Sequence, residues 1–195
     1  MTDSAFHRLW NLNYRLLLPI VPPNAPVSER STMFKRIGTP QDSRGKIPGV
    51  KGRDGNWYGI DLTTCVADEH DLSRWSAMGA GVGIRTGLQP DGTHLLAIDA
   101  DTMDTEHAIT IRDAVDVAFG RPPCRIGQSP KALYLVRASA PMPYSRIEFG
   151  TERVEVLSDG RQFVAEGIHP KTGKPYVWPR GLVAFDDLPI VQVTA

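Results

Sequence analysis

The sequence predicts an α/β or α+β protein built on a mixed sheet, and three observations support this fold class. Residues 94–101, HLLAIDAD, are apolar on both alternating faces, which is typical of a central strand. Residues 102–123 carry apolar side chains at helical spacing and end in Gly120 and two prolines, which predicts a helix capped by Thr102 or Asp104. The later segments KALYLVR, RVEVL and RQFVAEG are predicted strands, the last two joined as a hairpin through SDG. A strand, a helix and further strands predict one layered domain.

The N-terminal third is predicted to hold fewer regular elements. Residues 1–18 repeat apolar side chains at helical spacing, and the prolines of LPIVPP end that helix. Residues 21–56, rich in proline and glycine, are expected to form a long surface loop. The segment DEHDLSRWSAMG predicts a short helix closed by Gly79, and AGVGIRTG predicts a short strand that leads into a turn.

Length and composition predict one soluble domain over residues 1–195, with an N-terminal helix and basic loop over 1–56 and a core from about 57 to 195. Hydrophobic residues make up 41% and charged residues 23% of the chain, as in globular proteins. No segment approaches the roughly 20 apolar residues that span a bilayer, and the N-terminus does not resemble a signal peptide. We therefore expect a cytoplasmic location and no membrane partner. Cys65 and Cys124 are isolated, which predicts neither a disulfide framework nor a zinc site.

The formal net charge is zero, but its local distribution is uneven. Residues 28–53 contain seven basic and two acidic side chains, whereas residues 99–118 contain six acidic side chains and one arginine. Both runs could be ordinary solvated surface. The alternative is a cationic rim that faces an anionic metal pocket.

Two acids end the predicted central strand. Asp99 and Asp101 are two residues apart, so their side chains point to one face of the sheet, about 7 Å from each other. Two carboxylates this close repel each other unless a cation lies between them, and Mg²⁺ and Mn²⁺ take such oxygen ligands. The alternative is that one acid caps the following helix and the other is solvated.

A third acid strengthens the prediction of a metal site. Glu155 alternates with Val154 and Val156 in RVEVL, so it leaves the opposite face of its strand. An acid in mid-strand is costly unless it is exposed or coordinated. If this strand neighbours Asp99, three carboxylates converge, and together they can hold two ions that activate a nucleophile and stabilise a leaving phosphate oxygen.

Cationic and hydroxyl groups suited to phosphate lie further along the chain. Ser129 and Lys131 flank a proline just before KALYLVR, and His169 follows Gly167 in a predicted turn. The alternatives are an ordinary Ser-Pro turn, a solvated lysine and a structural histidine.

Four segments, taken in order, resemble a known family. GVGIRTG, LLAIDADT, RIGQSPKALYLVR and VEVLSDGRQFVAEGIHPKTGKPYVW, preceded by GKIPGVKGRDGNW, resemble the N-terminal domain of bifunctional DNA primase/polymerases, a branch of the archaeo-eukaryotic primase superfamily found in plasmid and phage replication proteins. The resemblance runs from about Gly45 to the end of the chain. It implies an RNA-recognition-like sheet with an added N-terminal α/β unit.

The resemblance also implies roles for particular residues. Asp99, Asp101 and Glu155 become the catalytic ligands of two divalent ions, Mg²⁺ or Mn²⁺, although many relatives carry aspartate at the third position. The family's second motif, often Ser-x-His, matches Ser129 and Lys131, and lysine replaces the directional imidazole with a point charge. The remaining expected roles are triphosphate binding by Arg85, Ser129, Lys131 and His169, and template binding by Lys46, Lys51 and Arg53.

The implied activity is that of a DNA primase and polymerase that uses nucleoside triphosphates and a single-stranded DNA template, working with a helicase in the same or another polypeptide. Two other functions remain open. Clustered carboxylates with Lys131 and His169 also suit a metal-dependent nuclease, and a non-catalytic module that binds nucleotides or single strands in a replication complex would need no active acids.

Overall fold

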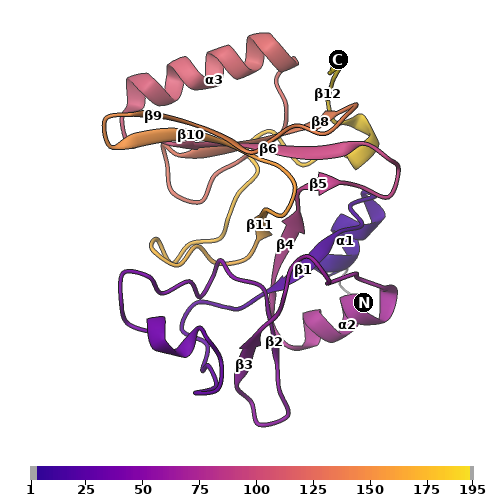
Figure 1. Ribbon diagram of the computed structural model, residues 1–195, viewed down its shortest axis with the longest axis vertical. Coiled ribbons are helices and arrows are strands. Elements are labelled where there is room, and N and C mark those ends of the chain that lie inside the picture. The colour runs from indigo at the N-terminus through magenta and orange to yellow at the C-terminus, as the bar shows by residue number, and fades with distance from the viewer. Residues whose placement is uncertain (1–3, 194–195) are drawn as a thin grey trace. The chain divides into compact units, whose positions relative to one another are not determined.

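The structure is a computed structural model of the 195-residue chain, and it describes residues 4–193. The chain divides into two compact units (Figure 1). Unit 1 comprises Met1–Ile84 and Phe163–Pro175, and unit 2 comprises Arg85–Gln162 and Tyr176–Ala195. Strands outnumber helices in the described chain, so the protein is a mixed α/β structure consistent with an α+β fold. No helix of residues 4–193 has both the length and the apolar character needed to cross a membrane.

Unit 1 is built on a small antiparallel sheet and two short helices. The sheet has the order β1-β4-β11, and a separate hairpin pairs β2 with β3. The helices pack through Phe6 and Trp75, whose ring centroids are 5.5 Å apart. Its elements are α1 (Ala5–Asn11), β1 (Leu17–Ile20), the 3₁₀ helix η1 (Phe34–Arg36), β2 (Gly49–Lys51), β3 (Trp57–Gly59), α2 (Glu69–Ala77), β4 (Gly81–Arg85) and β11 (Gln162–Glu166).

The helix predicted over residues 1–18 is much shorter than expected. Residues 1–3 lie outside the described residues, and α1 covers only Ala5–Asn11. Asn13 adopts a positive φ of 68°, which interrupts the helical path. Leu17 and Leu18 belong instead to β1 (Leu17–Ile20), where all four side chains are buried. A short apolar run is compatible with the spacing of a helix and with that of a buried strand. Here the run pairs with β4 and is a strand.

The predicted loop over residues 21–56 is more ordered than its composition suggested. It contains η1 and β2, and the hairpin partner β3 follows directly after it. Val21, Val27 and Met33 are buried with Trp57 in a small core of their own. This segment therefore has a fixed conformation on which exposed side chains can be positioned. Further along, α2 and β4 confirm the predicted short helix and strand, and Gly79 has the expected positive φ of 73°.

Unit 2 is built on a mixed seven-stranded sheet. Its main path is β12-β8-β6-β10-β9; β5 pairs with β6, and β7 with β8. Among the strands described for this sheet, only β12 runs parallel to its neighbour, β8. The elements are β5 (Gly87–Leu88), β6 (His94–Asp101), α3 (Thr105–Phe119), β7 (Cys124–Arg125), β8 (Ala132–Ala138), β9 (Ser145–Phe149), β10 (Glu152–Leu157), the 3₁₀ helix η2 (Phe185–Asp187) and β12 (Ile190–Val191). The predicted central strand is confirmed as β6.

Helix α3 covers one face of this sheet (Figure 1). It begins at the N-cap Asp104 and ends at Gly120, whose φ is 69°, which confirms the predicted helix. Leu96, Ile98 and Ala100 of β6 pack in the core that includes Val115 of α3. Since side chains alternate along a strand, the odd-numbered residues of β6 emerge on the opposite face, away from α3.

The predicted hairpin between RVEVL and RQFVAEG is wrong. Strand β10 pairs with β6 and β9, whereas β11 joins β1 and β4 in the other sheet. Ser158 is buried, and the Thr86 hydroxyl donates a hydrogen bond of 2.5 Å to the Ser158 carbonyl. The SDG segment is thus a connection between sheets. The true hairpin partner is β9, an exposed strand in which only Ile147 and Phe149 are apolar, so its alternation is short.

A pH-dependent contact joins the start of α3 to β10. The Glu152 carboxylate accepts hydrogen bonds from the backbone nitrogens of Met103 and Asp104, both at 3.0 Å, and lies 2.8 Å from His107 Nδ1. Hydrogen bonds from the Thr102 side chain and from His107 lower the pKa of Glu152 to about 2. The hydrogen bond to Glu152 raises the pKa of His107 above 6.5. Both groups are therefore charged at mildly acidic pH.

We expect this contact to stabilise unit 2 most strongly between about pH 4.5 and 6.5. The contribution of Glu152 is complete above its ordinary pKa of 4.5 and is lost as the pH falls toward 2, whereas that of His107 is complete below 6.5 and is lost as the pH rises through its raised pKa. Thermal melts of the wild type and Glu152→Gln across pH 3–9 test this, with Glu148→Gln on β9 as control. A difference in Tm that stays constant with pH would contradict the expectation.

Candidate active site

The three predicted carboxylates lie on one face of two adjacent strands. In the antiparallel register of β6 and β10, Glu155 is directly opposite Asp99, and Arg153 is opposite Asp101. Residues opposite each other in such a pair point to the same face. Asp99, Asp101 and Glu155 therefore share the face of the sheet opposite to α3. Strands β6 and β10 are neighbours, as the convergence of the three carboxylates requires.

A row of charged residues crosses the sheet through Asp99. Arg125 of β7 is opposite Leu133 of β8, and Leu133 is in turn opposite Asp99. On the other side, Glu155 is opposite Arg146 of β9. The two acids at the centre of the row are thus flanked by an arginine at each end. The positive charges at the two ends of the row offset part of the repulsion between the two carboxylates.

Asp101 lies between two cations. Lys131 Nζ is 2.5 Å from Asp101 Oδ1, and Arg153 Nη2 is 2.9 Å from Asp101 Oδ2. Arg153 also donates from Nε to Glu155 Oε2 at 2.8 Å, so it bridges two of the three acids. The hydrogen bond to Glu155 raises the pKa of Arg153 further. These side chains are partly exposed, so each ion pair contributes at most about 1 kcal/mol, and the contacts can exchange.

Tyr144 holds the other oxygen of Glu155. Its hydroxyl donates a hydrogen bond of 2.6 Å to Glu155 Oε1, and Arg161 Cζ lies 4.6 Å from the centroid of its ring. Burial raises the pKa of Glu155, but the hydrogen bonds from Tyr144 and Arg153 outweigh burial and lower it overall. The same bond to Glu155 raises the pKa of Tyr144. Glu155 is therefore held as a carboxylate in a defined orientation.

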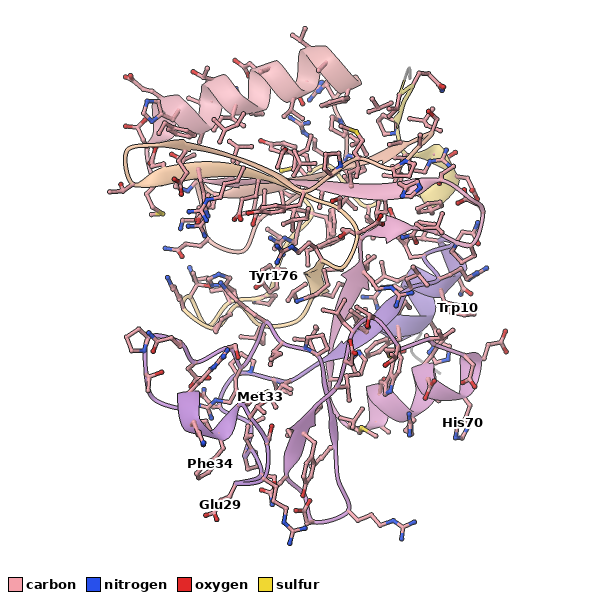
Figure 2. All side chains as sticks on the ribbon, in the orientation of Figure 1. Trp10, Glu29, Met33, Phe34, His70 and Tyr176 are labelled. Carbon is pink, nitrogen blue, oxygen red and sulfur yellow. The ribbon has the colours of Figure 1, made fainter. Side chains whose placement is uncertain are left out.

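Asp99 interacts electrostatically with Arg125 and Tyr176. Arg125 Cζ lies 4.6 Å from the centroid of the Tyr176 ring, which is buried and is labelled in Figure 2. Burial lowers the pKa of Arg125, and the negative charge of Asp99 acts in the opposite direction. Tyr176 therefore covers the guanidinium of Arg125, which interacts with Asp99.

The three acids suit a divalent ion by chemistry but are not assembled around one. Carboxylate oxygens are the ligands that Mg²⁺ and Mn²⁺ prefer. Within residues 4–193, however, no group of three or more His, Cys, Asp or Glu side chains is close enough to hold a metal ion. Arg153 and Lys131 occupy the carboxylate oxygens instead. Metal binding at this face would require these two cations to move.

The other predicted site residues are spread over both units. Ser129 is exposed in the turn before β8, close in sequence to Lys131, and Arg85 is the last residue of β4. His169 belongs to unit 1, where it is buried and its Nδ1 accepts a hydrogen bond of 3.2 Å from the Thr172 backbone. The predicted template residues also lie in unit 1, and all are exposed: Lys46, Lys51 and Arg53. Their roles stay predictions.

Sequence reasoning missed Arg153, Tyr144 and Arg161. A signal for Arg153 was present, because it stands two residues before Glu155 and so shares its face of the strand. No comparable signal existed for Tyr144, whose contact depends on the path of the chain into β9. Asp99 and Asp101 were found because acids at the end of an apolar strand are conspicuous, whereas Arg153 stands in the polar first half of β10 and is not.

One family model matches the chain. It is described as the N-terminal domain of bifunctional DNA primase/polymerases, and it covers residues 17–191, which include all three acids and both cations of the site. No curated protein matches the sequence. The match spans most of unit 1 and nearly all of unit 2. With the match extending over far more than half of its length, the chain belongs to the bifunctional DNA primase/polymerase N-terminal domain family.

Proposed function

We propose that this protein is a template-directed nucleotidyltransferase that extends, and without a primer initiates, DNA strands in the replication of a plasmid, phage or other mobile element. Membership of the family points to DNA primase/polymerase-type activity. The observation that carries the proposal is the placement of Asp99, Asp101 and Glu155 on one face of adjacent strands. The proposed partners are a single-stranded DNA template, nucleoside triphosphates and a helicase.

Asp99, Asp101 and Glu155 are the residues that would hold two divalent ions. Such ions, when bound, lower the pKa of the attacking 3′-hydroxyl and neutralise charge on the pyrophosphate leaving group. The chain's own contribution is to place the three acids on one face and to orient Glu155 as a carboxylate. Tyr144 fixes one oxygen of Glu155 for this purpose.

The cations of the site have a second proposed role. Lys131 and Arg153 neutralise Asp101 and Glu155 in this structure, and once the carboxylates coordinate ions, both side chains become available to phosphate oxygens. We propose that Lys131, Ser129, Arg85 and His169 hold the triphosphate. The exposed residues Lys46, Lys51 and Arg53 would bind template phosphates, so binding should weaken with salt.

Primer extension tests this proposal directly. The protein is incubated with primed or unprimed single-stranded templates, labelled ribo- or deoxyribonucleotides, and Mn²⁺, Mg²⁺ or a chelator. We expect metal-dependent product growth with release of one pyrophosphate per nucleotide, because attack of the 3′-hydroxyl on the α-phosphate breaks its bond to the β-phosphate and displaces pyrophosphate. Product without a primer would identify priming. Strand shortening without pyrophosphate would identify a nuclease instead.

One observation favours a second candidate, a non-catalytic module that binds single strands. Asp101 and Glu155 are already neutralised by Lys131 and Arg153, so these residues can form a stable surface without metal. Absence of product with every metal, together with retained binding of single strands, would support this candidate over the polymerase.

A further inference from the structure

Unit 1 contains a polar pocket that the proposed catalytic steps do not use. Its volume is about 510 Å³, and it opens between the segment around η1 and the β2–β3 hairpin. This volume lies within the range of roughly 300–1,000 Å³ typical of small-molecule sites. Glu29, Phe34 and Tyr58 are among its lining residues. Figure 2 labels Glu29 and Phe34 at this end of the unit.

One wall of the pocket is held rigid by Asp54. Its carboxylate accepts hydrogen bonds from the Tyr58 hydroxyl at 2.8 Å, from Asn56 Nδ2 at 3.0 Å and from the Asn56 backbone at 3.1 Å. The Tyr58 ring also lies against Gly52, where an added Cβ would come within 2.7 Å of ring carbon Cε2. Asn56 and Tyr58 are therefore positioned before any ligand arrives, which lowers the entropic cost of binding.

The part of the pocket formed by Glu29, Arg30 and Phe34 carries exposed side chains. Phe34 is a large apolar side chain with 40% of its surface exposed. Within residues 4–193, neither the Glu29 carboxylate nor the Arg30 guanidinium has a hydrogen-bond or ion-pair partner. Both belong to exposed residues that line the pocket. An aromatic face, an anion and a cation are thus available together to a ligand.

The surroundings of the pocket are cationic. Lys35 and Arg36 follow Phe34 in η1, and Lys51 and Arg53 lie at the end of β2 and in the turn after it; all four are exposed. A ligand that suits this surface carries several negative charges outside the pocket and a flat group inside it. Single-stranded nucleic acid has this chemistry, since its phosphates bind cations and its bases stack on aromatic side chains.

We propose that this pocket takes one base of a single-stranded DNA, with Phe34 stacking on the base and Glu29 accepting a hydrogen bond from its exocyclic amino group. Arg30 and the surrounding cations contact the flanking phosphates. A carboxylate can accept from the amino group of cytosine, adenine or guanine, whereas thymine and uracil carry no amino group. The pocket therefore prefers bases that carry an amino group. The inference rests on the proposed template binding and adds a base-reading subsite to it.

Fluorescence anisotropy with labelled 12-nucleotide strands of deoxycytidine or deoxyuridine tests the subsite, because these bases differ in the amino group and not in ring size. We expect the wild type to bind deoxycytidine strands more tightly. Phe34→Leu should weaken binding of both strands about tenfold, as loss of a base–aromatic stack does. Glu29→Gln should bring the two affinities to within about twofold of each other, because the amide can accept from the cytosine amino group through its oxygen or donate to the uracil carbonyl through its nitrogen.

Matched controls keep the test specific. Glu69→Gln changes an exposed glutamate on α2, and Leu88→Ala changes an exposed apolar residue in unit 2; both should bind as the wild type does. Both pocket substitutions are at exposed positions, and thermal melts check that the variants remain folded.

Two results would overturn the inference: wild-type affinity in Phe34→Leu, or an unchanged cytosine preference in Glu29→Gln. If the wild type still extends primers, either result rules out base binding by this pocket and leaves the proposed polymerase function intact. If the wild type neither binds single strands nor extends primers, the polymerase proposal and the pocket fail together.

Discussion

Changing both Asp99 and Asp101 to alanine is expected to abolish nucleotide incorporation. The two carboxylates point to one face of β6, where they would hold the divalent ions, and Glu155 alone cannot replace them. A bound metal contributes several kcal/mol of transition-state stabilisation, so the rate should fall by at least about 10³-fold. The measurement is primer extension with Mn²⁺ or Mg²⁺ at saturating nucleotide. The variant also controls for a contaminating polymerase.

The fold should survive this double substitution. Asp101 and its two cations are partly exposed, and each ion pair contributes no more than about 1 kcal/mol. Removing the two acids relieves their mutual repulsion but also takes counter-charge from Lys131, Arg153 and Arg125, so we expect only a small change in Tm. Asp113→Ala, at an exposed acid on α3, serves as the matched control and should keep full activity. Wild-type rates in the double variant, with its Tm unchanged, would exclude these acids from catalysis.

The second large effect is expected on stability, from Leu96→Ala in the core beneath α3. Leu96 is only 2% exposed and packs among Ile98, Tyr134 and Val136. Deleting a buried leucine side chain leaves a cavity as well as losing buried apolar surface, which costs about 2–5 kcal/mol of the free energy of unfolding. Urea denaturation followed by circular dichroism measures this loss.

Leu88→Ala is the matched control for Leu96→Ala. It removes the same atoms from β5, which pairs with β6, but Leu88 is 58% exposed. Its effect should lie within about 0.5 kcal/mol, as for most surface substitutions. Equal losses in the two variants would show that the core beneath α3 does not stabilise unit 2 in the expected way.

Local pattern was enough to predict several elements. The alternation in HLLAIDAD identified β6 as a central strand, and the cap and stop signals at Asp104 and Gly120 bounded α3. These predictions succeeded because a long apolar strand and a capped helix are specified by residues close together in the chain. The same alternation showed that Asp99 and Asp101 share a face.

Patterns that depend on a distant partner misled the prediction. Leu17 and Leu18 fit a helix until their pairing with β4 is known, and RQFVAEG looks like the partner of RVEVL until β11 is found in the other sheet. Strand β9 was missed because an exposed edge strand buries little apolar surface and leaves little trace in the sequence.

The sequence by itself therefore determined the family, the central strand, the long helix and the identity of the three acids, because each is encoded by residue type and short-range spacing. Only the tertiary structure decided that Glu155 stands opposite Asp99, that Lys131 and Arg153 neutralise Asp101, and that Tyr144 orients Glu155. Those contacts join residues far apart in the chain. Strand register and the path of the chain determine these contacts, and local periodicity in the sequence predicts neither of the two.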